Sequence, residues 1–526
     1  MMNSFEKHIA DDRMPEAVRK ILSAKKRRRR IIFAALGSLP FVLIGWWLWS
    51  NEAGNRAIQA QIDRYRAAGQ PVYPADFDPP PTPDENNAAL ALKEAAAALD
   101  LEDTVFDFSA DGCDPRKISK HHDEFNRITK TNSEVLALIR QARSMTGADW
   151  GMRMRSPVIA VLIPSLGDRK DLIRFLFLTA IYYHQIGNDA EAIEILRDAL
   201  ASAKALRKMR LLISLMVTVA EDALVCSTIE DITVDLKVLP SGSVTSASSQ
   251  AVGRKQVRAL IAELLDEKEL CKSAQWSFYA ERAFVFDTAM LCLDGKQSLS
   301  LASGGVASTW EKVKVNALKP VLKEDAIRML RYMTVQAEAA GQTNWPAVKE
   351  KMPEDPQVQG LLKRLTHMFS NTLAPTLGRA MEMDFRSRAM RRMAAVALAI
   401  RLYEIDNGRR PEKLTDLVPK YIPAIPDDPF DTPGRPLRYL PGVQRPILFS
   451  IGGNGKDQGG QYAENPDEPP DYDDYDIPFF LNGDRPRYEE ESDEKEPASQ
   501  PRVGSGRFGG RGMARRSKPP PTTMPR

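Results

Sequence analysis

Hydrophobic positions along the 526-residue chain follow three patterns. An uncharged apolar run covers residues 31–49, apolar residues recur with helical spacing from about 88 to 375, and short strand-like runs appear only near the C-terminal end. Recurrence every three to four residues is typical of amphipathic helices, whereas alternation is typical of strands. The sequence therefore predicts a mainly α-helical protein with a few short strands near its C-terminal end.

The apolar run Ile31–Trp49 holds nineteen residues without a charge, close to the roughly 20 that a helix needs to cross a bilayer. Six consecutive bases, Lys25–Arg30, precede it, whereas the other flank carries Glu52 and Arg56. Because cytoplasmic flanks are rich in Lys and Arg, we expect a single-pass protein of the cytoplasmic (inner) membrane. Its N-terminus would lie in the cytoplasm and the bulk of the chain outside it. A cleaved signal peptide and a buried soluble helix are the alternatives.

Composition and topology divide the chain into six parts. They are a basic cytoplasmic tail (1–30), a transmembrane helix (31–49), a stalk and Pro-rich linker (50–87), an α-helical scaffold domain (88–375), an α+β module (379–482) and a charged, then Gly/Arg/Pro-rich tail (483–526). Residues 461–499 hold fourteen acids, and residues 501–526 hold seven bases and no acid. Such blocks of charge are typical of disordered tails, so we expect the last part to be disordered.

Residues 176–203, "LFLTAIYYHQIGNDAEAIEILRDALASA", resemble a tetratricopeptide repeat. Small and aromatic residues stand at the spacings of that motif: Ala180, Tyr183, Gly187, Ala192 and Ala199. The resemblance implies a tight helical hairpin that turns at the glycine. No second copy is evident, although repeat arrays need several units to bury a continuous core. An ordinary helical hairpin is the alternative, and either one gives an α-helical scaffold.

Three motifs follow one another in residues 396–460: "ALAIRLYEIDNGRRPEKLTDLV", "IPAIPDDPFDTPGRPLRYLPG" and "ILFSIGGNGKDQGG". In this order they resemble the globular part of the major pseudopilin (protein G) of the bacterial type II secretion system. The residues themselves predict a long helix from about 379 that stops at Asn407-Gly408, and two short strands, Leu437–Leu440 and Ile447–Ile451. The resemblance implies that residues 379–482 form a small α+β module with a short antiparallel sheet. The acidic pair Asp427-Asp428 falls in the turn-rich part and needs no catalytic role.

The chain departs from the pseudopilin pattern at its N-terminal end. Its apolar segment lies about 330 residues before the module, and no prepilin cleavage pattern stands at the start of that segment. We therefore do not expect this chain to polymerise as a pilus subunit. The order of parts is similar to that of uncharacterised envelope proteins of planctomycete-type bacteria.

The same resemblance implies a calcium-binding loop between the last strands. Calcium takes six to eight oxygen ligands from carboxylates, amides, backbone carbonyls and water. The expected ligands are Asn454, Asp457, Asp471, Asp473 and Asp474. Asn454 stands where the family has Asp and supplies only one neutral oxygen, so the aspartates would have to compensate. A plain Gly/Asn turn beside a solvated acidic tail is the alternative.

Other chemical signals are weak. The four cysteines, Cys113, Cys226, Cys271 and Cys292, show no C-x-x-C spacing, which leaves disulfides and isolated buried thiols both open. His121 and His122 are adjacent, so their side chains would point in different directions on a strand or on a helix. They seldom bind one metal together. No hydrolase elbow, kinase motif set or H-E-x-x-H zinc motif occurs. We therefore expect no enzyme activity. The basic tail 501–526 could bind nucleic acid, but it would lie outside the cytoplasm on the predicted topology, so we expect no nucleic-acid partner.

These features predict a membrane-anchored envelope protein that acts by protein–protein interaction, in secretion or envelope organisation. Pilin-like or secretion components are the expected partners, and calcium is the expected cofactor. One alternative is an envelope enzyme with an unrecognised active site in the helical domain, which a deep cleft with converging titratable side chains would mark. Another is an accessory component of a pilus-like secretion system.

Overall fold

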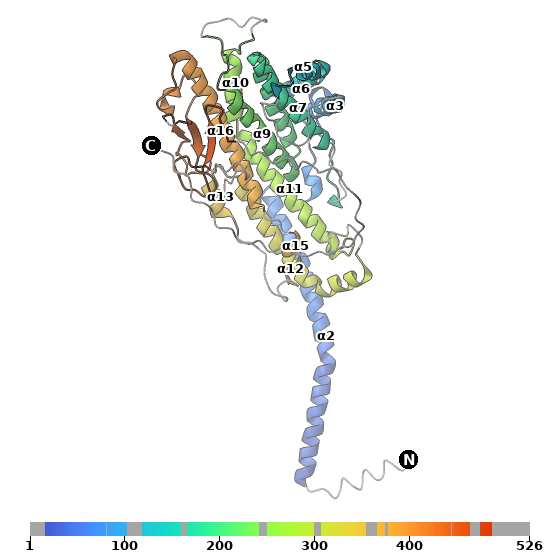
Figure 1. The fold of residues 1–526 in the computed structure, drawn as a ribbon. Helices are drawn as coiled ribbons and strands as arrows, with labels where there is room; N and C mark the ends of the chain where they lie inside the picture. The colour runs from blue at the N-terminus through green and yellow to red at the C-terminus, as the bar shows by residue number, and fades with distance from the viewer. Residues whose placement is uncertain are drawn as a thin grey trace, which may run out of the picture. The chain divides into compact units, whose positions relative to one another are not determined.

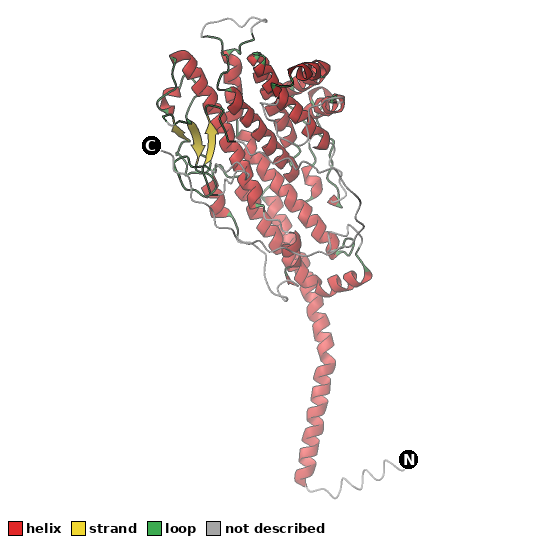
Figure 2. Cartoon of the chain, viewed as in Figure 1, coloured by secondary structure: helices red, strands yellow, loops and turns green. Residues whose placement is uncertain are grey.

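The computed structural model describes residues 16–79, 81–101, 118–158, 166–240, 250–298, 307–353, 366–373, 377–442, 444–462 and 474–486. These residues are mainly helical, with one small sheet (Figures 1 and 2). The predicted fold class, mainly α with a short antiparallel sheet, is confirmed. The chain forms two compact units. Unit 1 contains Met1–Gln70, Thr288–Leu330 and Pro356–Ala374, and unit 2 contains Pro71–Asp287, Arg331–Asp355 and Pro375–Arg526.

The helices of the described residues are α2 (Glu16–Ala67), α3 (Ala88–Ala98), α5 (His122–Thr131), α6 (Ser133–Ser144), α7 (Leu166–Gln185), α8 (Asp189–Arg207), α9 (Leu212–Ile232), α10 (Arg254–Leu265), α11 (Lys268–Leu293), α12 (Thr309–Ala340), α13 (Trp345–Lys351), α15 (Met368–Leu373) and α16 (Gly378–Asn407). Short 3-10 turns are η1 (Pro74–Phe77), η2 (Asp84–Asn86) and η5 (Leu414–Leu417). The strands are β1 (Arg438–Leu440), β2 (Ile447–Ser450) and β3 (Ile477–Phe480).

Helix α2 contains the whole apolar run 31–49 and continues beyond it without a break to Ala67. By length and composition, two of the described helices could cross a bilayer: Ala24–Ala67 within α2, and α9. Core helices and signal sequences share these properties. The apolar window of α2 is not buried against other parts of the chain, whereas 56% of the α9 window is buried. Helix α9 packs against α8 and α16, as a core helix does, so α2 is the stronger candidate for a membrane span.

Helices α7 and α8 form the helical hairpin expected from the sequence. Gly187 lies between them with a φ of +81°, a left-handed conformation that costs glycine little. The Asn188 side chain caps α8 by accepting a hydrogen bond from the backbone N–H of Glu191 at 3.3 Å. Ala180 and Ala192 are fully buried, so the two helices approach closely. Helix α9 packs on both helices, so the hairpin is part of the helical core of unit 2.

The three strands form one antiparallel sheet in the order β1-β2-β3. Tyr439 pairs with Leu448, and Leu448 pairs in turn with Phe479. The first two strands match the predicted ones, whereas β3 has no counterpart in the predictions. Its four residues include Pro478 and follow an acidic stretch, and proline is depleted in strands. Pro478 is tolerated because β3 is an edge strand that pairs only with β2.

Helix α16 supports the sheet through a segment that is apolar and buried all round the helix. Residues 393–400 of α16 are all buried, and the helix contacts β2 and β3. The helix ends at Gly408 in a left-handed conformation with φ +70°, the C-terminal stop that its Asn-Gly step predicts. Three thiols, Cys226, Cys271 and Cys292, are free, and Cys113 lies outside the described residues.

Candidate functional site

The predicted calcium ligands are engaged separately from one another in unit 2. The Asn454 side chain accepts the backbone N–H of Lys456 at 2.8 Å. The Asp457 carboxylate accepts Nε of Arg438 at 3.1 Å and the N–H of Gly459 at 3.0 Å. Asp474 takes part through its backbone carbonyl, which accepts Nε2 of Gln458. Asp471 and Asp473 lie outside the described residues. Among those described, no three His, Cys, Asp or Glu side chains gather as a metal site.

Two basic side chains of the protein, Arg438 and Lys349, already bind acceptor oxygens of this loop. Arg438 contacts Asp428 at 2.9 Å and Asp457 at 3.1 Å, and it also contacts Asp431. Lys349, on α13, donates to the backbone carbonyl of Gly453 at 2.6 Å. A calcium ion would therefore have to compete with these two side chains for the oxygens of the loop. The sequence pattern did not reveal this, because Arg438 and Lys349 lie outside the loop motif.

A buried carboxylate outside the predicted ligand set organises the loop instead. Asp476 is fully buried and accepts the backbone N–H groups of Gln458 at 3.2 Å and Gly460 at 2.8 Å. Burial raises the pKa of Asp476 to about 6, although these hydrogen bonds oppose the shift. The stretch 448–460 is therefore a strand followed by a tightly hydrogen-bonded loop.

The helical part of unit 2 contains a cavity of about 490 Å³. This volume is in the range of small-molecule sites. The hairpin helix α8 and helix α11 supply much of the lining, and shorter contributions come from η1, α6, α10, α16 and the segment after α8. The apolar side chains in the lining include Phe77, Leu200, Leu270 and Trp276. A ligand could therefore bury an apolar group here.

Basic side chains dominate the charged lining of the cavity. Eight are present, Arg143, Arg197, Lys204, Arg207, Lys208, Arg210, Lys272 and Arg391, against three acids, Glu263, Asp266 and Glu269. In the part of the chain that the structure describes, three of the eight have no carboxylate within ion-pair distance: Lys208, Arg210 and Lys272. An excess of cations around a concave surface concentrates anions in it.

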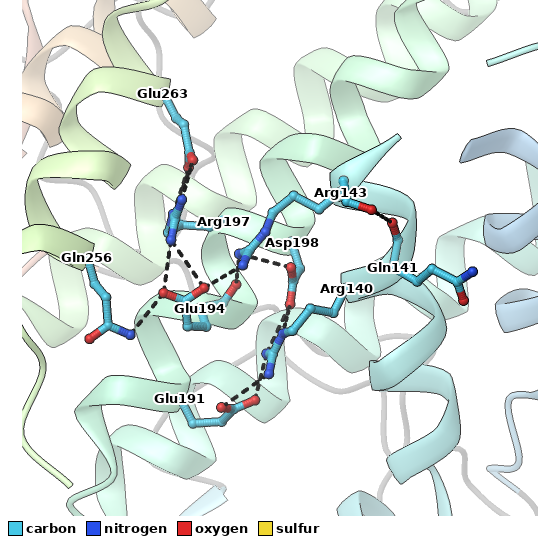
Figure 3. Close-up of polar contacts among 10 residues, drawn as sticks. Arg140, Gln141, Arg143, Glu191, Glu194, Arg197, Asp198, Gln256 and Glu263 are labelled. Atoms are coloured by element: carbon cyan, nitrogen blue, oxygen red, sulfur yellow. Dashed lines mark hydrogen bonds and ion pairs between the residues drawn. The ribbon is translucent and has the colours of Figure 1, made fainter. Parts of the chain in front are cut away.

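An ion-pair network holds one wall of the cavity (Figure 3). Arg143 of α6 contacts Glu194 at 2.6 Å and Asp198 at 3.0 Å on α8. Arg197 bridges Glu194 and Glu263, the latter on α10, at 2.9 and 2.8 Å. Burial raises the pKa of Asp198 to about 6, although Arg140 and Arg143 oppose the shift. These arginines are neutralised by the protein, so they shape the wall and leave anion binding to the unpaired cations.

Arg210 is the most unusual residue of the lining. Its φ is +55°, the one positive φ outside glycine among the described residues. Non-glycine residues held in this conformation carry roughly 1–3 kcal/mol of strain and tend to occur at functional sites. The Arg210 guanidinium lies 4.3 Å from the centroid of the Trp276 ring, and Phe77 meets the same ring edge-on at 5.8 Å. The cavity thus presents a cation on an aromatic platform.

The ammonium of Lys208 lies near two other cations, Lys204 and Arg210. Burial lowers the pKa of Lys208, and the neighbouring Lys204 and Arg210 lower it further. Burial also lowers the pKa of Arg210, with Glu269 opposing. The ammonium of Lys208 donates to the carbonyl of Thr146 rather than to a carboxylate. A bound anion would relieve this repulsion.

The cavity was not predicted from the sequence. One signal was present: the stretch "KALRKMR", residues 204–210, holds four bases in seven residues. Such a run is equally typical of an ordinary helix end, where Lys and Arg interact favourably with the helix dipole. Only the packing of α11 and η1 against it creates a cavity with an aromatic floor.

Comparison of the chain with protein-family models, with curated proteins and with solved structures found no match.

Proposed function

We propose that this chain is a membrane-anchored binding protein whose basic cavity takes an anionic ligand with a flat apolar group. The observation that carries the proposal is the set of three cations, Lys208, Arg210 and Lys272, that line the cavity without a carboxylate partner among the described residues. The floor of Phe77 and Trp276 supports the apolar half of the ligand. Polar groups that fix orientation above an apolar floor are typical of small-molecule sites.

The rest of the proposal comes from the sequence. Helix α2 anchors the protein in the cytoplasmic membrane, with residues 1–30 inside the cell and the cavity outside it. The module over residues 379–482 acts as a pseudopilin-like contact surface for protein partners of the envelope or of a secretion system. The uncovered apolar window of α2 supports the anchor. The α16-plus-sheet arrangement supports the module.

The cavity is tested with a probe that has both halves of the proposed ligand. The full chain in nanodiscs is titrated calorimetrically with 1-naphthyl phosphate, with inorganic phosphate and with 1-naphthol. We expect 1-naphthyl phosphate to bind most tightly and to weaken as salt rises, because ions screen exposed charges. Arg210→Gly should weaken it about tenfold or more, since a hydrogen bond to a charged group contributes about 1.5–3 kcal/mol.

The melting temperature separates loss of binding from loss of fold. Glycine adopts a positive φ without steric cost, so Arg210→Gly should leave the melting temperature unchanged or slightly higher. Lys255→Ala is the matched control, because this exposed base on α10 is outside the cavity lining. Equal affinity in wild type and Arg210→Gly would refute the proposed site. Weaker binding by Lys255→Ala to the same degree would show a nonspecific charge effect instead.

Calcium remains a proposal for the loop after β2. A Ca²⁺ ion there would draw on Asn454, Asp457 and the acidic stretch 471–474, and it would displace Arg438 from Asp457. Titration of the full chain with calcium chloride should then release or absorb heat, and Asp457→Asn should reduce that heat. A wild-type chain without calcium heat and with an unchanged melting temperature leaves only the hydrogen-bonded loop.

The enzyme alternative draws on the same cavity. A deep cleft with converging titratable side chains is its expected mark, and the cavity brings Lys208 and Glu269 into one lining. Lys208 with its lowered pKa would be the candidate nucleophile. We favour a binding function over an enzymatic one, because the three unpaired cations explain anion binding in the cavity and no reaction has to be assumed.

A further inference from the structure

The start of helix α12 exposes large apolar side chains in unit 1. Trp310 is 65% exposed and Val313 is 52% exposed. They stand at positions i and i+3, so they share one helical face. Val315, on the other side, is buried. An exposed tryptophan and valine on a helix whose other side is buried indicate a surface that contacts an apolar partner or environment.

The first turn of α12 is held firmly. Ser308 and Glu311 form a reciprocal cap: the N–H of Ser308 donates to the Glu311 carboxylate at 2.8 Å, and the N–H of Glu311 donates to Oγ of Ser308 at 3.2 Å. Oγ of Ser298 also donates to Glu311 at 2.8 Å. Such a capping box stabilises a helix start. Trp310 is therefore presented by an ordered turn.

Two contacts set the depth of this turn along α2. Nε1 of Trp47 donates to the carbonyl of Ala317 at 3.2 Å, and Nζ of Lys323 donates to Oδ1 of Asn51 at 2.7 Å. Both helices advance from the first contact to the second, so they run parallel here, side by side in Figure 1. Pro320 lies inside α12 between Ala317 and Lys323, and proline kinks a helix. In Figure 1 the first part of α12 runs across α2 rather than along it, so residues 309–319 lie near the depth of Trp47.

Trp47 lies near the end of the apolar run, where three tryptophans, Trp46, Trp47 and Trp49, mark the depth of a membrane interface. Trp310, Val313 and Ala317 fall on one helical face, and the backbone carbonyl of Ala317 accepts the indole N–H of Trp47. The exposed face of α12 thus continues the apolar surface of α2 at the level of the lipid headgroups.

The charges around this face suit anionic headgroups. The segment 309–319 holds three bases, Lys312, Lys314 and Lys319, and one acid, Glu311. Nζ of Lys314 lies 5.4 Å from the Trp310 ring centroid. The carboxylate of Glu311 is turned to the helix cap. Tryptophan beside lysines is typical of helices that lie in a membrane interface.

We propose that residues 309–319 form a second membrane contact, in which Trp310 and Val313 enter the headgroup region and the lysines meet anionic lipid. This inference rests on the membrane anchor of the proposed function. It does not depend on the cavity. The occupant is the bilayer itself, because the face is continuous with the helix that crosses it.

The test measures depth in the bilayer with a fluorescent label. Full chains carry one NBD group on an introduced cysteine, in nanodiscs that contain phosphatidylglycerol. The background replaces Cys113 and Cys271 by alanine and keeps the buried Cys226 and Cys292, and the labelled background without an added cysteine is the blank. Nitroxide lipids quench the label either near the headgroup or near the middle of the acyl chain.

Three label positions separate the outcomes. Leu43→Cys reports the membrane span, Val313→Cys reports the proposed contact, and Ala67→Cys, at the far end of α2, is the matched control about 27 Å beyond Trp49. We expect the shallow nitroxide to quench position 313 at least twofold more than position 67, and the deep nitroxide to quench position 43. Position 313 quenched no more than position 67, with position 43 quenched, overturns this inference alone. An unquenched position 43 overturns the anchor as well.

Discussion

Replacing Asp428 by alanine is expected to destabilise unit 2 by about 3–5 kcal/mol, because it leaves three buried donors unsatisfied at a cost of about 1–3 kcal/mol each. Asp428 is 1% exposed. Its carboxylate accepts Oγ of Ser450 at 2.6 Å, the N–H of Ile451 at 2.9 Å and the N–H of Phe430 at 3.0 Å. It also accepts Nη1 of Arg438 at 2.9 Å. Alanine would leave the donors of Ser450, Ile451 and Phe430 without this acceptor, whereas Arg438 would keep Asp431 and Asp457.

The neighbouring Asp427 is the matched control for this variant. Asp427 is exposed, and its carboxylate accepts the N–H of Gly434 at 3.0 Å. Water can replace that partner, so Asp427→Ala should cost about 1 kcal/mol or less. Thermal unfolding of the full chain in nanodiscs, followed by circular dichroism, measures both variants. Equal melting temperatures for Asp428→Ala and Asp427→Ala would contradict the role given to Asp428.

Replacing Asp222 by alanine should be comparably severe, because Asp222 joins three helices and pairs with two arginines of the cavity lining. It lies on α9 and is 1% exposed. Its carboxylate pairs with Arg207 at the end of α8, and with Arg391 of α16 at 3.0 Å. Oγ of Ser387 donates to it at 3.1 Å. The variant would bury two uncompensated guanidinium groups, and we again expect a loss of about 3–5 kcal/mol.

A compensated variant distinguishes charge from packing. Asp222→Leu together with Arg207→Met and Arg391→Met removes all three charges at once. Apolar replacement of a whole buried ionic cluster is often neutral or stabilising, so most of the lost melting temperature should return. Asp235→Ala is the control on an exposed carboxylate just after α9 and should change the stability by at most about 1 kcal/mol. If the triple variant does not regain the melting temperature, the loss comes from altered packing of the side chains and not from buried charge.

The C-terminal module shows how far local patterns reach. Its long helix ends at the Asn-Gly step, and its first two strands lie where short strand-like runs predict them. The third strand was missed because Pro478 and the preceding acids argue against a strand locally. Pairing with β2 alone makes that strand acceptable. The pair Asp427-Asp428 looks uniform in sequence, yet one carboxylate is solvated and the other anchors four donors.

Local patterns were sufficient for the features that depend on residues close together in the chain. They predicted the helical character, the apolar segment 31–49, the α7–α8 hairpin with its glycine turn, and the stop at Gly408. The reason is that helical periodicity, turn conformation and a continuous apolar run are properties of short segments. The stretch 448–460 was likewise predicted as a strand followed by a turn.

The tertiary structure alone decided where charges are paired. In the sequence, Lys204, Lys208 and Arg210 look like the basic end of one helix, but packing against α11 and η1 places them around a cavity with Trp276 and Phe77 on its floor. Arg438 and Lys349 similarly meet the loop after β2 from positions outside its motif. Whether a charge lies in water, in an ion pair or at the wall of a cavity depends on segments distant in sequence, because Coulomb energies depend on distance and burial in space.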